Sequence, residues 1–127
     1  MSPYKSEDAN DDDDLRMAGE HKTARIRRFN DGFRKSGVGG TIVLTQGVNA
    51  LSESDRTIVL GKVRAFEAFN PDNDPHGEHD FVRVEHDGTT YFGKIDYYAK
   101  DMKQGSEDPG DPNQTARVLT IMRADEY

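Results

Sequence analysis

Apolar residues recur at helical spacing in two segments of the chain, residues 15–35 and residues 52–69. The first segment carries the apolar side chains of its predicted core face at Ile26, Phe29 and Phe33. The second begins with Ser52 and Asp55, which are spaced as in a capping box, and it stops before Pro71. Both segments are therefore predicted to be amphipathic helices that pack one face against a core.

Four other segments have the composition or the alternation of β-strands, namely residues 41–45, 81–86, 89–98 and 116–123. Asp87-Gly88 separates the middle two and predicts a two-residue hairpin turn with positive φ at both positions. The element order α-β-α-β-β-β predicts an α+β fold, with a mainly antiparallel sheet of about four strands and two helices packed on one face. We expect residues 15–127 to form this single domain.

A turn at Asp87-Gly88 also fixes which residues of the hairpin lie opposite one another. The pairing places one set of apolar side chains on the face that we expect to meet the core: Val82, Val84, Tyr91 and Ile95. On the other face His79 would lie opposite Asp96, with Lys94 and Tyr98 close by, at roughly 5 Å between the Cβ atoms of opposite residues. One small helical layer cannot cover both faces, so this polar and aromatic face is expected to be partly exposed.

Charge is distributed unevenly along the chain, whose formal net charge is −7. Residues 1–14 hold six acidic residues against one basic residue, which leaves a net charge of −2 for the rest of the chain. We expect this acidic segment to be a disordered tail. The chain has no cysteine, which excludes disulfides and thiolate sites, and no apolar run long enough to cross a membrane. A cytoplasmic protein without a membrane partner is therefore expected.

The densest group of candidate ligands lies between the second helix and the hairpin, over residues 72–80. Together with the polar face of the hairpin it forms a predicted binding surface, made up of Asp72, Asp74, His76, Glu78, His79, Asp80, Lys94, Asp96 and Tyr98. Imidazole and carboxylate groups could bind a divalent ion such as zinc, with His76, His79 and Asp80 as the candidate ligands. The simpler interpretation is a turn whose Asp and Asn side chains bond to backbone amides, and we expect no cofactor.

A histidine oriented by a carboxylate, as predicted for His79 and Asp96, is suited to general acid–base catalysis. The motifs that often accompany such chemistry are missing, because the chain has no nucleophile elbow, P-loop or dinucleotide fingerprint. We therefore assign no catalytic residue. The arginines of the first helix could contact phosphates, but the acidic balance of the chain argues against direct nucleic-acid binding.

Five short stretches carry a family resemblance, namely Arg25–Asp31, Pro71–Pro75, Gly77–Phe81, Lys94–Tyr98 and Arg117–Met122. In these stretches the chain resembles a bacterial family of uncharacterised proteins, domain-of-unknown-function family 3768, over about residues 24–127. The resemblance implies a setting on plasmids or other mobile genetic elements, and with it a part in plasmid maintenance or in conflict between host and element.

Two hypotheses about function follow. The preferred one is a small acidic binding or regulatory protein that acts by contact with a protein partner and inhibits a host defence or nucleic-acid-processing complex. The alternative is a metal-assisted, hydrolase-like enzyme that uses His79, Asp96 and the carboxylates of residues 72–80. Both leave the oligomeric state open.

Overall fold

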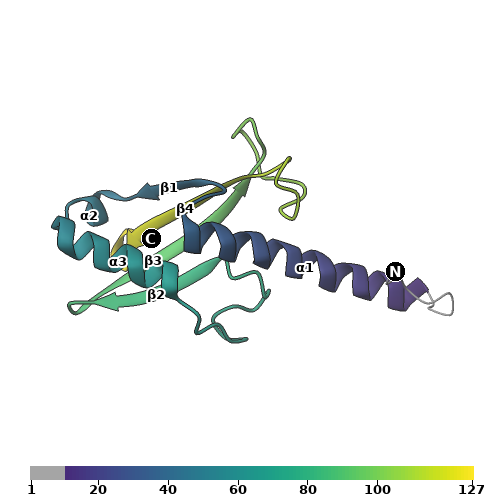
Figure 1. The fold of residues 1–127 in the computed structure, drawn as a ribbon, viewed down its shortest axis with the longest axis horizontal. Coiled ribbons are helices and arrows are strands. Elements are labelled where there is room, and N and C mark those ends of the chain that lie inside the picture. Colours follow the sequence, from purple (N-terminus) through teal and green to yellow (C-terminus); the bar gives the residue numbers. More distant parts are fainter. Residues whose placement is uncertain (1–10) are drawn as a thin grey trace.

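The computed structural model describes residues 11–127, with side chains from residue 21 onward (Figure 1). Within this range the chain forms three α-helices, four strands and a short 3₁₀ helix. Their bounds are α1 Asp11–Ser36, β1 Thr41–Leu44, α2 Gln46–Asn49, α3 Glu53–Ala65, β2 Phe81–His86, β3 Thr89–Tyr98, β4 Ala116–Arg123 and η1 Ala124–Glu126. The predicted α+β fold class is confirmed.

The four strands form one sheet in the order β1-β4-β3-β2. Both pairs that involve β3 are antiparallel, whereas β1 runs parallel to β4. The parallel pair arises because the chain passes through α2, α3 and the whole β2–β3 hairpin between these two strands. The sheet is therefore mainly antiparallel, as predicted, and β1 and β2 are its edges.

The register of the hairpin agrees with the one predicted from its turn. Asp87 and Gly88 have φ values of 52° and 78°, as a type I′ turn requires. The pairing runs from His86 opposite Thr89 to Phe81 opposite Lys94. Because side chains alternate along a strand, this register decides which residues face the helices.

All three helices contribute to a single core against one face of the sheet (Figure 1). The helical members of the core are buried apolar side chains: Phe33, Val48, Val59 and Val63. The sheet supplies Val82, Val84, Tyr91, Ile95, Leu119 and Ile121 from its alternating positions. Since the helices pack on this face, the opposite face of the sheet carries no helical layer.

The predicted helix over residues 52–69 ends earlier than expected. Ser52 caps α3 by accepting a bond from the backbone N–H of Asp55, as predicted, but the helix stops at Ala65. Phe66 is extended, with ψ at 130°, and Phe66 and Phe69 instead pack at the edge of the core. The prediction of helix to Phe69 was therefore wrong, because packing of these two aromatic side chains outweighs the helical periodicity that suggested it.

Helix α1 begins at Asp11. The acidic tail predicted for residues 1–14 thus overlaps the first turn of α1, and its residues 1–10 lie outside the described part of the chain. The short helix α2 was not predicted, because four residues are too few to show a periodicity. No helix in the described range is both long and apolar enough to span a membrane.

Candidate functional site

The segment between α3 and β2 is a turn held by its own asparagines. Oδ1 of Asn70 accepts bonds from the backbone N–H groups of Asp72 and Asn73, at 2.8 and 2.9 Å. Asn73 accepts a return bond from the N–H of Asn70 at 2.9 Å, and Asp74 accepts one from the N–H of His79 at 3.1 Å. These contacts are those of a capped turn.

The imidazole of His79 is held between two carboxylates. Its Nδ1 lies 2.9 and 3.0 Å from the two carboxylate oxygens of Asp31 on α1, and its Nε2 lies 3.6 Å from Oδ2 of Asp74. The ring also stacks on Phe69, with 3.7 Å between ring centroids and an interplanar angle of 6°. Both ring nitrogens therefore face carboxylates of the same chain.

The predicted pair of His79 and Asp96 is wrong. His79 has a φ of 56°, so the extended backbone of β2 does not reach it, and the antiparallel ladder ends where Ile95 donates to the carbonyl of Asp80 at 2.8 Å. The left-handed backbone turns the imidazole toward the helical layer. Asp96 lies on the opposite face of the sheet, where it pairs with Lys94 at 3.2 Å.

A buried arginine extends the Asp31 network to the end of α3. Arg34 is 1% exposed, and its Nη2 donates to Asp31 at 2.9 Å. Its Nη1 donates to three carbonyls at the C-terminal end of that helix, those of Val63, Arg64 and the capping residue Phe66. Carbonyls at a helix C-terminus lack intrahelical partners and carry partial negative charge. The Arg34 guanidinium donates hydrogen bonds to these carbonyls, and its positive charge is favourable at this end of the helix.

A second network joins α1 to the sheet and to both long loops. Asn30 is fully buried and donates to the carbonyl of Glu78 and to the hydroxyl of Tyr97, at 3.0 and 2.7 Å. Its Oδ1 accepts from Nε of Arg117 at 2.8 Å. The Tyr97 hydroxyl donates to Glu78 at 2.7 Å, and burial with this bond raises the pKa of Tyr97.

Two other arginines of α1, Arg25 and Arg27, donate hydrogen bonds to loop backbone. Arg27 donates to the carbonyl of Gly77 and Arg25 to that of Gly110, both at 2.8 Å. The arginines fix the loop before β2 and the loop between β3 and β4 against α1.

The remaining loop residues do not converge on a metal or a substrate. Asp72 and His76 are exposed, and burial raises the pKa of Asp80, which also feels the nearby Glu78 and Asp74 carboxylates. In the part of the chain with described side chains, no group of three His, Asp or Glu residues is arranged to hold a metal ion. The residue set of the enzyme hypothesis is not assembled, because His79 and Asp96 lie on different sides of the sheet.

The sequence carried signals for these networks that the prediction did not use. Asn30 and Arg34 lie on the same face of the first helix as Ile26 and Phe33, so this spacing places two polar side chains on the face that meets the core. Arg117 occupies a core-facing position of β4 and is 3% exposed. A buried polar side chain on an apolar face needs partners, and that requirement points to a network.

The predicted binding surface is thus divided between two places. Of its loop members, Glu78 and His79 contact α1, whereas Lys94, Asp96 and Tyr98 lie on the sheet face without helices, which we call the bare face. Cross-strand pairing places further residues on the bare face: Val43, Phe81, Phe92, Val118, Thr120 and Met122.

Three aromatic rings cluster on the bare face. Phe81 and Phe92 are cross-strand neighbours with ring centroids 5.0 Å apart. The C-terminal Tyr127 folds back to within 5.9 and 5.7 Å of these rings, and Nζ of Lys94 lies 5.8 Å from the Tyr127 ring. Tyr127 is nevertheless 71% exposed, so the cluster is only partly covered.

Comparison with protein families matches residues 44–126 to a family described as a protein of unknown function, DUF3768. The chain belongs to this family. The matched region contains the loop before β2 and most of the sheet and of its bare face, but α1 precedes it. The resemblance noted from the sequence is confirmed for this region. No curated protein and no solved structure matches the chain.

Proposed function

We propose that the chain is a binding protein that acts by contact with a partner protein, and that the bare face of its sheet is the contact surface. The observation that carries this proposal is the aromatic cluster of Phe81, Phe92 and Tyr127 on a sheet face without a helical layer. Antiparallel sheets with one solvated face normally place polar residues there. Aromatic residues on an open surface are instead typical of the centre of a protein interface.

The charges on the bare face favour a protein over a polyanion. Lys94 is paired with Asp96, and at the edge of the sheet Arg83 is paired with Glu85 at 3.2 Å. A surface that binds a nucleic-acid backbone needs an excess of positive charge, whereas this one is balanced. We therefore infer a partner with an apolar patch flanked by at least one acidic and one basic group.

The mobile-element setting implied by the family resemblance gives the partner a class. We propose that it belongs to a host complex that processes or defends against foreign nucleic acid, and that the chain inhibits it. Support for this finer proposal is the resemblance alone. The contact surface can be tested without it.

Site-specific photo-crosslinking in the native host tests the proposal. A photoreactive phenylalanine analogue at position 92 should give a crosslink to one defined protein. The same analogue at Ile58, which is 41% exposed on α3, is the matched control and should not. Crosslinks of equal yield from both positions would contradict the proposal, and so would a crosslink at position 92 to a second copy of the chain.

A further inference from the structure

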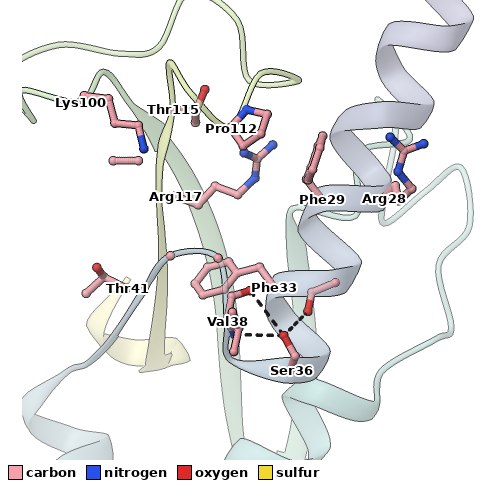
Figure 2. A pocket seen from close by; sticks show the side chains of 14 residues that line it. Arg28, Phe29, Phe33, Ser36, Val38, Thr41, Lys100, Pro112, Thr115 and Arg117 are labelled. Atoms are coloured by element: carbon pink, nitrogen blue, oxygen red, sulfur yellow. Dashed lines mark hydrogen bonds between the residues drawn. The ribbon is translucent and has the colours of Figure 1, made fainter.

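A groove of about 680 Å³ lies between the second half of α1 and the segment that leads into β4 (Figure 2). None of the aromatic residues of the bare face lines it. Its apolar surface comes from Phe29, Phe33, Val38 and Pro112. Sites for small molecules have this character, a concave and mostly apolar surface of roughly 300–1,000 Å³ with a few polar groups.

The charged residues that line the groove are all basic: Arg28, Lys100 and Arg117. Acidic and basic residues are nearly equal in number beyond residue 14, where the net charge is −2, so a groove lined by bases alone differs from the average surface of the domain. Neither Arg28 nor Lys100 has an ion pair within residues 21–127. The Asp111 carboxylate interacts with Lys100 electrostatically but forms no ion pair with it, so the positive charge that lines the groove is only partly compensated.

Arg117 adds a second and independent observation. The side chain is buried, and its guanidinium donates to Asn30 and to the carbonyl of Pro109, which are neutral acceptors. It lies between the rings of Phe29 and Tyr97, with its Cζ 5.5 and 5.4 Å from their centroids. Burial lowers the pKa of Arg117 even though Tyr97 and the Glu78 carboxylate act in the opposite direction, so an anion in the adjoining groove would offset part of the cost of burying this cation.

A glycine shapes the floor of the groove. A Cβ atom at Gly40 would lie 2.5 Å from the carbonyl oxygen of Arg117 and 2.7 Å from Cζ of Phe33. The backbone therefore approaches Arg117 more closely than any other residue would allow. Figure 2 shows Phe33 and Arg117 in the middle of the groove, with Lys100 and Arg28 on opposite sides.

We propose that this groove binds a phosphorylated small molecule of nucleotide size. Its phosphate would contact Lys100, Arg28 would add positive charge from the other side of the groove, and its apolar part would lie against Phe29, Val38 and Pro112. Lysine and arginine are the usual side-chain donors to phosphate, and their charge-assisted hydrogen bonds are about twice as strong as neutral ones.

Titration calorimetry at low salt, with the ribonucleoside monophosphates as probes, tests the proposal. We expect saturable binding of at least one of them with a stoichiometry of one, and no comparable binding of the matching nucleoside. Lys100→Glu and Arg28→Glu should each weaken that binding by about tenfold or more. Lys103→Glu is the matched control, because it makes the same charge change in the same loop outside the groove, and it should leave binding unchanged.

Three results would overturn the proposal. The first is a lack of saturable binding by every monophosphate. The second is equal weakening by Lys103→Glu, which would show a general charge effect. The third is binding of a glutamate-rich peptide in this groove, abolished by Lys100→Glu, while the monophosphates do not bind. Circular dichroism of each variant checks that the fold is retained, and since Lys100 and Lys103 are exposed we expect no change.

Discussion

Nδ1 of His79 lies 2.9 Å from Oδ1 of Asp31, and this contact joins the loop before β2 to the middle of α1. Asp31 also accepts a bond from the buried Arg34, which in turn binds the last carbonyls of α3. The Asp31 carboxylate therefore connects three parts of the molecule, namely the loop before β2, helix α1 and the end of α3. The stability of this part of the molecule should depend on it.

Replacement of Asp31 by alanine is expected to lower the free energy of unfolding by about 3 kcal/mol, because it leaves the buried Arg34 without a counter-charge. Urea denaturation measures the change. Glu67→Ala is the control, since it removes the exposed partner of Lys35 and should cost less than about 1 kcal/mol. Equal losses in the two variants would contradict a structural role for the Asp31 network.

Replacement of Asn30 by alanine removes three hydrogen bonds at a fully buried position. We expect a loss of about 2–3 kcal/mol, since Nε of Arg117 and the carbonyl of Glu78 would be left without this partner. Asn113→Ala, at an exposed position, should change the free energy of unfolding by less than about 0.5 kcal/mol. Comparable urea midpoints for both variants would show that the network does not contribute.

Because the pKa of Asp80 is raised, replacing its carboxylate with a neutral side chain should change the free energy of unfolding by an amount that depends on pH. Burial, with Glu78 and Asp74 nearby, disfavours the charged carboxylate in the folded state, although His76 acts in the opposite direction. The folded state therefore favours the protonated carboxyl. The contribution of Asp80 to the free energy of unfolding is fully present below its ordinary pKa of 3.8, and it is lost as the pH rises through the raised pKa of the folded state. Asp80→Asn should stabilise the protein at pH 7, and this gain should shrink as the pH approaches 3.8.

Urea denaturation at both pH values measures the effect, with Asp72→Asn as the control because Asp72 is an exposed carboxylate of the same loop. A gain for Asp80→Asn that is the same at both pH values would contradict the proposed cause.

Two glycines should respond in opposite ways to replacement by alanine. Gly40→Ala should destabilise the protein by about 1–3 kcal/mol, because the new Cβ would clash with the backbone of Arg117. Gly61→Ala, in the middle of α3 with no atom within 4 Å of the added Cβ, should stabilise it by roughly 0.5–1 kcal/mol. Thermal unfolding distinguishes the two. A stabilising Gly40→Ala would show that the close approach is not rigid.

Local signals in the sequence were sufficient for much of the fold. The Asp87-Gly88 turn fixed the hairpin register, because a two-residue turn leaves a single way to pair the strands. The alternation of apolar residues then placed Val82 and Val84 on the core face. These predictions depend on neighbours in sequence, and that is why they succeeded.

The site depends on contacts between residues far apart in the chain, and there the prediction failed. The hairpin register was extended back to His79, but His79 is a left-handed residue that lies before Asp80, so the strand pairing does not extend to it. Although histidine is enriched among the few non-glycine residues with positive φ, the residue type alone did not predict this conformation at His79. Its true partner, Asp31, is 48 residues away, so only the packing of α1 on the loop could identify it.

The affinity of the crosslinked partner for purified variants tests the central claim most directly, namely that the bare face is a protein-binding surface. Phe92→Ala should weaken the complex by about 2 kcal/mol, roughly thirtyfold in the dissociation constant, as expected for an aromatic residue at the centre of an interface. Ile58→Ala on α3 should leave the dissociation constant unchanged. An unchanged affinity for Phe92→Ala, with the fold intact, would contradict the account.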